Sequence, residues 1–169
     1  AEAAMPALER LYTIAPSFRA EKSRTRRHLT EFWHAEMEVA WANNNEIMSY
    51  GEGVVRKIAK TLLEERSAEL QSLDRDLETI ARYADSKFPR IRYDEAVETL
   101  QGMGVEIEWG QDLDYSKEKV LTQDFDVPHF LTHYPKIAKP FYHRVDPDDE
   151  NYVLCHDLLA PEGYGEIIG

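Results

Sequence analysis

The stretch FRAEKSRTRRHLTEFWHAEME, residues 18–38, decides the fold class because it places a cationic loop between two strand-like runs. Leu11–Ala15 (LYTIA) leads into the loop, and Trp33–Trp41 (WHAEMEVAW) follows it. In the second run apolar residues alternate with polar ones, which is the period of a β-strand with one apolar face. The pattern predicts two strands joined by a loop rich in arginine.

Length and composition indicate one globular domain. The chain has 169 residues, of which 43% are hydrophobic and 31% are charged, and such values are typical of a folded globular protein. No apolar run approaches the ~20 residues that a membrane-spanning helix needs. The single cysteine, Cys155, excludes an internal disulfide bond and fits a cytoplasmic location.

The charge balance restricts what the cationic loop can bind. The net charge of the chain is −12, which disfavours broad binding to nucleic acid, because that binding depends on neutralising many phosphates. We therefore expect the loop to bind a small anion in a pocket. The alternative is a solvated loop, which is the commoner meaning of a run of Lys and Arg.

The middle of the chain has helical periodicity. Asn43–Asn45 are plausible N-cap residues, and apolar residues follow at helical spacing. A second helix is expected around Leu77–Ala84 and must end before Pro89. Ile91–Tyr93 is expected to be extended, and Asp94 to cap a third, short helix. The apolar stripe of the first helix consists of Ile47, Val54, Val55, Ile58, Leu62 and Leu63.

From Val127 onward the pattern changes to strands separated by turn residues. The expected strands are HFLTHY (129–134), PFYHRV (140–145), YVLCHDLL (152–159) and GEIIG (165–169). The whole pattern predicts an α+β fold, in which the first and last parts of the chain form an antiparallel sheet and helices from the middle pack against it.

The residues around the cationic loop fit a nucleotide site. Arg19 ends the first strand, where its planar guanidinium can bind a phosphate or a carboxylate through two hydrogen bonds. Glu21 can accept hydrogen bonds from an exocyclic amine such as that of adenine, and Phe32 offers a flat ring on which a purine can stack. Arg27 and His28 can reach the more distant phosphates.

The same stretch resembles motif 2 of the class II aminoacyl-tRNA synthetases, in the aspartyl, asparaginyl and lysyl subgroup. The match runs through FRAE, the basic loop and RHLTEF. The segment HYPKIAKPFYHRVDPDDENYVLCHDLLAPEGYGEIIG, residues 133–169, is similar to the asparaginyl members in particular. The resemblance covers almost the whole chain and implies the antiparallel sheet of the class II catalytic core.

The resemblance implies a two-step reaction. Asparagine is activated with ATP to asparaginyl-adenylate, and the amino acid is then transferred to tRNA(Asn). ATP and Mg²⁺ are the implied cofactors, and the family acts as a homodimer. Such phosphoryl transfer depends on positioning and charge neutralisation and needs no covalent enzyme intermediate.

The resemblance also assigns roles in ATP binding. Arg19 is expected to bind the α-phosphate of ATP and the carboxylate of the amino acid, which makes it the expected catalytic residue. Glu21 is expected to contact the adenine amino group, and Phe32 to stack on the adenine ring. Arg27 and His28 are expected to contact the γ-phosphate end.

Three further carboxylates complete the expected site. Asp157 and Glu166 match the acidic pair that holds Mg²⁺ with ATP, and oxygen ligands suit that metal. The turn between them allows adjoining strands to bring both carboxylates to one ion. Glu36 is the candidate for contacting the side-chain amide of asparagine.

The resemblance predicts a partial catalytic domain over residues 1–169. Motif 2 is expected at about 11–41, a helical insertion at about 44–104, and C-terminal strands at about 127–169, while the anticodon-binding domain, motif 1 and motif 3 are expected outside this chain. We therefore expect this chain alone to be inactive. The alternatives are a noncatalytic binding module derived from the fold, a paralogue related to asparagine synthetase, and an aspartyl-tRNA synthetase.

Overall fold

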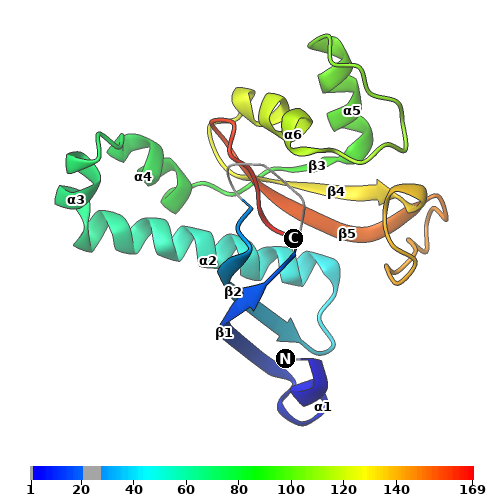
Figure 1. The fold of residues 1–169 in the computed structure, drawn as a ribbon, viewed down its shortest axis with the longest axis horizontal. Helices are drawn as coiled ribbons and strands as arrows, with labels where there is room; N and C mark the ends of the chain where they lie inside the picture. The colour runs from blue at the N-terminus through cyan, green and yellow to red at the C-terminus, as the bar shows by residue number, and fades with distance from the viewer. Residues whose placement is uncertain (1, 21–27) are drawn as a thin grey trace. The chain divides into compact units, whose positions relative to one another are not determined.

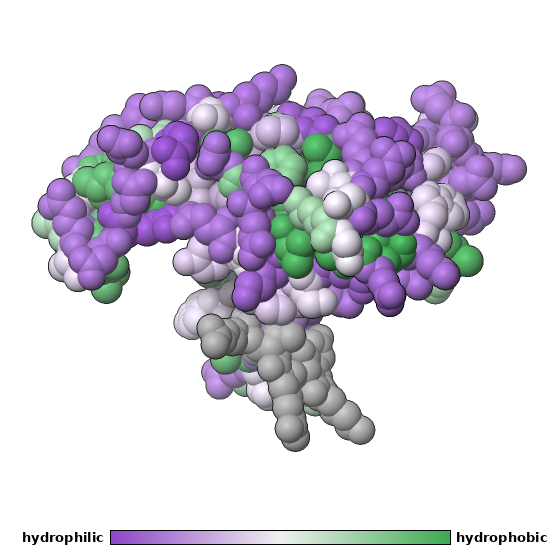
Figure 2. Space-filling model, turned by 90° about the horizontal axis from the view of Figure 1, so that it is seen from above, coloured by the Kyte–Doolittle hydropathy of each residue, from purple (hydrophilic) through white to green (hydrophobic). Residues whose placement is uncertain are grey.

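The computed structural model describes residues 2–20 and 28–169, which fall into two compact units. We call Ala1–Asn43 unit 1 and Asn44–Gly169 unit 2, and Figure 1 shows the ribbon of each. Hydrophilic residues cover most of the surface visible in Figure 2, and hydrophobic residues gather in separate patches. Within the described part of the chain, no helix is long and apolar enough to cross a membrane.

Unit 1 is built on an antiparallel pair of strands, β1 (Arg10–Phe18) and β2 (Glu31–Val39). A 3₁₀ turn, η1 (Glu2–Ala4), and a short helix, α1 (Met5–Leu8), precede the pair. Both strands predicted from the sequence are confirmed. The second ends earlier than predicted, because Trp41 lies beyond β2 in a turn with a φ of 68°.

The two strands of unit 1 place apolar side chains together on one face. The register sets Tyr12 opposite Met37 and Pro16 opposite Trp33, and directly opposed residues share a face in an antiparallel pair. This apolar face is exposed: Tyr12 has 76% and Trp33 74% of its surface accessible to solvent. A two-stranded ribbon without a covered apolar face is only marginally stable by itself.

Unit 2 contains a four-stranded sheet in the order β3-β4-β5-β6. The β3–β4 pair is parallel, whereas β4–β5 and β5–β6 are antiparallel. A register shift between Thr132 and Tyr134 interrupts the β4–β5 ladder, and His133 between them has a φ of 54°. The strands are β3 (Arg90–Arg92), β4 (His129–Pro135), β5 (Tyr152–Ala160) and β6 (Gly165–Ile168).

Helices cover both faces of this sheet, as Figure 1 shows, with α5 and α6 on one face and α2 on the other. Asp76 caps α4 and Asp114 caps α6, each by accepting hydrogen bonds from backbone N–H groups of the first turn. The helical elements are α2 (Asn44–Glu65), α3 (Ser67–Ser72), α4 (Leu77–Asp85), α5 (Tyr93–Gly102), α6 (Tyr115–Leu121), η2 (Thr122–Asp124) and η3 (Lys136–Ala138).

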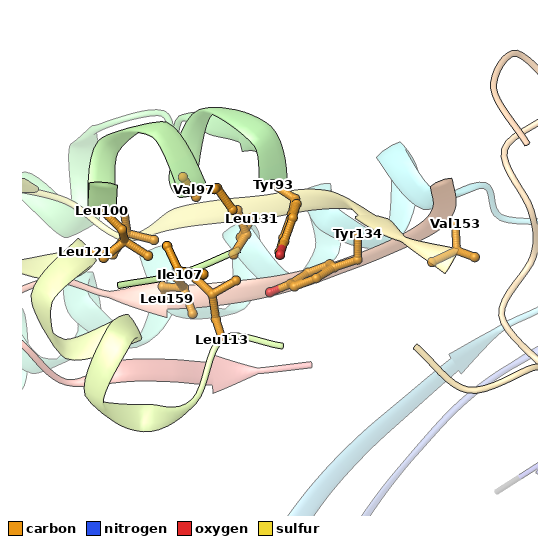
Figure 3. Close-up of a cluster of buried hydrophobic side chains, with 11 residues drawn as sticks. Tyr93, Val97, Leu100, Ile107, Leu113, Leu121, Leu131, Tyr134, Val153 and Leu159 are labelled. Atoms are coloured by element: carbon orange, nitrogen blue, oxygen red, sulfur yellow. The ribbon is translucent and has the colours of Figure 1, made fainter. Parts of the chain in front are cut away.

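The core of unit 2 lies on both sides of β4 and β5. Leu131 and Leu159 point toward α5 and α6, in the cluster drawn in Figure 3. Their chain neighbours Phe130 and Leu158 pack with Met48 of α2 on the opposite face. Because side chains alternate along a strand, a sheet covered on both faces needs a nearly continuous apolar run. Each fully buried Leu or Phe contributes ~1.5–3 kcal/mol relative to exposure, so this core holds β5 firmly in place.

The structure corrects several sequence expectations. Within unit 2 the β3–β4 pair is parallel rather than antiparallel, and PFYHRV is a loop, with Phe141 99% exposed, instead of a strand. Asp94 does not cap α5: its carboxylate accepts hydrogen bonds from Trp109 Nε1 and the Tyr152 hydroxyl. Helices α3 and α6 were not predicted.

The buried face of α2 also differs from the predicted stripe. Met48, Glu52 and Ala59 are its buried residues, whereas Val54 and Ile58 are exposed. A carboxylate therefore stands within the buried face. Glu52 is tolerated there because its two oxygens meet the Arg90 guanidinium and the Phe88 N–H, each at 3.4 Å.

Candidate functional site

The polar face of unit 1 carries three of the predicted site residues, Arg19, Phe32 and Glu36. Arg19 follows β1, and its N–H donates to the Thr30 carbonyl at 2.9 Å, which continues the antiparallel pairing past the end of both strands. Its guanidinium carbon lies 5.5 Å from the centre of the Phe32 ring, within the range of a cation–π contact. The structure thus brings Arg19 and Phe32 together.

Glu36 stands on the same face of β2 as Phe32. Thr13, directly opposite on β1, donates its hydroxyl to Glu36 Oε2 at 3.3 Å. The His34 ring lies between the two residues on this face: its Nδ1 is 3.7 Å from Glu36 Oε1, and its ring packs edge-on against Phe32. Sequence reasoning placed His34 on the polar face but gave it no role, and it missed Thr13.

The basic loop is only partly described. Glu21 and Arg27, two of the residues predicted to bind ATP, lie outside the described residues. His28 is described and exposed. The expected contacts of Glu21 and Arg27 with adenine and the γ-phosphate therefore stay predictions.

In unit 2, the two carboxylates predicted to hold Mg²⁺ converge at one point. Asp157 lies on β5 and Glu166 on the antiparallel neighbour β6. A Cβ atom placed on Gly169 would come within 2.6 Å of Glu166 Oε1 and 3.2 Å of Asp157 Oδ1. Gly169 thus leaves open the space that these two oxygens flank, and any larger residue would have to displace the Glu166 carboxylate.

The donor set fits Mg²⁺, which takes oxygen ligands and is commonly held by one or two carboxylates together with phosphate oxygens and water. Asp157 and Glu166 offer such carboxylates, and the Asp157 side chain is only 17% exposed. Larger groups, with three or more His, Cys, Asp or Glu side chains placed for a metal, do not occur within residues 2–20 and 28–169.

A lysine that the sequence did not identify completes this corner of unit 2. Lys139 Nζ lies 3.3 Å from Asp157 Oδ2 and 3.8 Å from the centre of the Tyr134 ring. Burial disfavours the charged ammonium, yet Asp157, together with contributions from Cys155 and Asp112, outweighs this effect and leaves the pKa of Lys139 above its usual value. Burial, with the charge of Asp157, likewise raises the pKa of Tyr134 well above its usual value. Lys139 therefore stays a cation beside Asp157.

Cys155 has a structural role in the core of unit 2. Its side chain packs against the core cluster of Figure 3. Burial raises the pKa of its thiol to about 11, so it is protonated at neutral pH and is a poor nucleophile.

Comparisons with known proteins give matches over almost the whole chain. The family described as "tRNA synthetases class II (D, K and N)" matches residues 1–169. The asparagine–tRNA ligase of Thermococcus gammatolerans is 52% identical over 168 residues, which are 99% of this chain and 39% of that protein. This chain thus spans about two fifths of the length of such curated relatives.

Solved structures of the asparaginyl type and of the aspartyl type both match this chain. The asparaginyl-tRNA synthetase of Pyrococcus horikoshii, solved with asparaginyl-adenylate, is 51% identical with a TM-score of 0.93, over 98% of this chain and 38% of that one. The aspartyl-tRNA synthetase of Entamoeba histolytica is 27% identical with a TM-score of 0.78, over 96% of this chain and 34% of that one.

Proposed function

Because this chain belongs to the class II tRNA synthetases of the D, K and N group, we propose that the protein containing it is an asparagine–tRNA ligase. The observation that carries the proposal is the identity of 52% across 99% of the chain with an asparagine–tRNA ligase. Within one organism, Entamoeba histolytica, the asparaginyl enzyme matches this chain with a higher TM-score (0.86) than the aspartyl enzyme (0.78), at nearly equal identities of 26% and 27%, which favours asparagine over aspartate. The proposed partners are asparagine, tRNA(Asn) and a second copy of the same protein, in the cytoplasm.

The geometry of unit 1 supports roles for its residues in the first step. An oxygen of the asparagine carboxylate attacks the α-phosphorus of ATP, and pyrophosphate leaves. Arg19 binds the α-phosphate and the carboxylate through its fork of N–H donors. Phe32, which Arg19 already contacts at 5.5 Å, stacks on adenine, with Glu21 on the adenine amine. Arg27 and His28 hold the departing phosphates.

Glu36 gives the site a means of choosing asparagine. A carboxylate accepts a hydrogen bond from the side-chain N–H of asparagine, whereas it repels the carboxylate of aspartate. The Thr13 hydroxyl holds one oxygen of Glu36 in place at 3.3 Å. We assign Glu36 this discrimination as part of the proposal.

Asp157 and Glu166 are the residues that would hold Mg²⁺ with ATP. The ion would neutralise charge on the phosphates during the displacement. The role of the protein is to present two carboxylates to the ion, and the Glu166 and Asp157 carboxylates both approach the open space beside Gly169.

The experiment is ATP–pyrophosphate exchange by the full-length protein with asparagine or aspartate, followed by charging of tRNA(Asn). We expect exchange with asparagine and charging of tRNA(Asn). Exchange with aspartate alone would identify the aspartyl type. Exchange with no charging would favour the paralogue related to asparagine synthetase, and failure to bind ATP would favour a noncatalytic module.

This chain alone is proposed to be inactive, since it spans 39% of the length of the relative and affinity falls steeply when part of a pocket is missing. Calorimetry of the 169-residue chain with ATP and Mg²⁺ tests this directly. Sub-millimolar binding would contradict it.

A further inference from the structure

A buried carboxylate on α6 contacts the backbone of a proposed metal ligand. Glu118 has only 6% of its surface exposed. Its Oε2 accepts the backbone N–H of Glu166 at 3.0 Å, across 48 residues of sequence. Glu166 lies on β6, the last strand in the order of the described sheet.

A carboxylate in such a place needs a reason, because burying a charged group is costly unless its hydrogen bonds are satisfied. The bond from the Glu166 N–H satisfies one oxygen of Glu118 and is a directional link between a helix and the strand that carries the proposed metal ligand.

The link acts where position matters most for the metal. The backbone at Glu166 sets the direction of its side chain, whose Oε1 must reach the point beside Gly169 that Asp157 Oδ1 also approaches. Asp157 lies on β5, which the core holds on both faces. Glu166 is exposed and pairs with Leu159 in the β5–β6 ladder, so the bond from its N–H to Glu118 is a second constraint on its backbone, supplied by the helix.

The same helix also supports the turn between the two ligands. Gly163, in this turn, has a φ of 78°. A Cβ atom placed on it would lie 3.2 Å from Cγ of Lys119, which is the residue after Glu118. Helix α6 therefore lies against the β5–β6 turn through the Lys119 side chain and bonds to β6 through the Glu118 carboxylate.

We propose that Glu118 is a positioning residue, whose buried carboxylate fixes the backbone of Glu166 so that the Glu166 and Asp157 carboxylates meet at one divalent cation. The inference rests on the proposed function for the identity of that cation as the Mg²⁺ of ATP. The contact between α6 and β6 does not depend on the reaction.

The test uses the full-length protein with two conservative substitutions that separate position from charge. Glu118→Gln keeps an oxygen acceptor at the same reach and removes the charge. Glu118→Asp keeps the charge and withdraws the acceptor by one methylene. If Glu118 acts by position, Glu118→Gln should leave unchanged the Mg²⁺ midpoint, which is the Mg²⁺ concentration that gives half-maximal ATP–pyrophosphate exchange. Glu118→Asp should raise this midpoint by about 10–100-fold and leave the KM for asparagine unchanged.

The matched control is Glu52→Asp, since Glu52 is a carboxylate of similar burial in the same unit, at 8% exposure. Its partners are Arg90 and the Phe88 N–H, so its substitution should lower thermal stability and leave the Mg²⁺ midpoint unchanged. An equal rise in both Asp variants would assign Glu118 to general stability and overturn the proposal.

Two readouts are independent of catalysis. The rate of hydrogen–deuterium exchange in the peptide that carries the Glu166 amide should be higher in Glu118→Asp than in wild type. In Glu118→Gln this rate should equal that of wild type. Binding of Mn²⁺ with a non-hydrolysable ATP analogue, followed by the electron paramagnetic resonance of free Mn²⁺, should weaken only in Glu118→Asp. If the wild type binds Mn²⁺ but performs no exchange, the proposed function fails while Glu118 is still tested. If Glu118→Asp leaves amide exchange and Mn²⁺ binding unchanged, the positioning role is wrong.

Discussion

Unit 1 and unit 2 position their proposed site residues in different ways. In unit 1, Arg19, Phe32 and Glu36 are aligned by the register of two strands whose apolar face is exposed, with Trp33 at 74%. In unit 2, Asp157 lies on a strand held by core on both faces, and Glu166 is held through Glu118. The difference teaches that strand pairing without a covered apolar face positions the proposed ATP-binding groups, whereas strand pairing and tertiary packing together position the proposed metal ligands.

The largest expected effect comes from unit 1. Replacing Arg19 by Lys keeps the charge and removes the planar fork, so we expect ATP–pyrophosphate exchange by the full-length protein to fall by about 10²–10³-fold. The matched control is Arg10→Lys at the opposite end of β1, which should leave exchange unchanged. A near wild-type rate for Arg19→Lys would remove Arg19 from the site.

The next effect concerns the core of unit 2 and depends on pH. His129 is fully buried, stacked on Phe125 with ring centres 3.6 Å apart, and burial lowers its pKa from 6.5 to about 4. Between these pH values the unfolded chain binds a proton that the folded chain does not. The free energy of unfolding should therefore fall as the pH drops from 6.5 to 4, by on the order of 3 kcal/mol.

The substitution His129→Phe keeps an aromatic ring against Phe125 and removes the titration. Urea unfolding midpoints between pH 4.5 and 7 should therefore vary less in His129→Phe than in wild type. His143→Phe, at a half-buried position in the loop after η3, is the control and should keep the wild-type slope. An unchanged slope in His129→Phe would show that other groups cause the acid sensitivity.

The proposed metal ligands should give a similar or smaller effect. Glu166→Gln removes one charged oxygen ligand, and we expect the Mg²⁺ midpoint of exchange to rise by about 10–100-fold. Glu150→Gln, an exposed carboxylate in the loop before β5, serves as the control. Unchanged Mg²⁺ dependence in Glu166→Gln would mean that the pair is misassigned, whatever the role of Glu118.

The smallest effect should come from the contacts that Glu162, in the β5–β6 turn, makes with Arg75 and Tyr83. Glu162 accepts hydrogen bonds from both terminal nitrogens of Arg75 and, at 2.7 Å, from the Tyr83 hydroxyl. Because these groups are partly exposed, we expect Arg75→Gln to lower the free energy of unfolding by about 1 kcal/mol or less. The thermal midpoint should drop slightly, and the drop should be smaller in high salt. Arg66→Gln, at an exposed pair with Glu69, should change less.

The contact between Arg75 and Glu162 has a defined pH dependence. The hydrogen bond from Arg75, helped by Tyr83, lowers the pKa of Glu162 below its usual 4.5. Its contribution is therefore present above about 4.5 and is lost as the pH falls through the lowered value. The difference in thermal midpoint between wild type and Arg75→Gln should disappear at lower pH, and a constant difference would contradict the assignment.

The sequence predicted what depends on local pattern. Alternation around Trp33 predicted β2, and helical spacing predicted α2 and α4. Alternation in the same run predicted a strand with one apolar face, and the register, which sets Tyr12 opposite Met37 and Pro16 opposite Trp33, confirms it. The resemblance pointed to Asp157 and Glu166, and the structure brings these two carboxylates together.

The sequence failed where a long-range contact decided the outcome. Asp94 looks like a helix cap, but its carboxylate bonds to Trp109 and Tyr152. PFYHRV has strand-forming residues, yet it forms a loop from which Phe141 projects. The partners of Lys139 and Glu118 are far away in sequence, at separations of 18 and 48 residues, so no local spacing reveals them. The Asp114 cap was the one local signal that could have predicted α6.

A crystal structure of the full-length protein with a non-hydrolysable ATP analogue and Mn²⁺ tests the proposed site most directly. We predict an anomalous peak for Mn²⁺ coordinated by the carboxylates of both Asp157 and Glu166, with the adenine ring stacked on Phe32 and the α-phosphate bound by Arg19. A nucleotide bound elsewhere, or a metal that contacts neither carboxylate, would contradict the proposal.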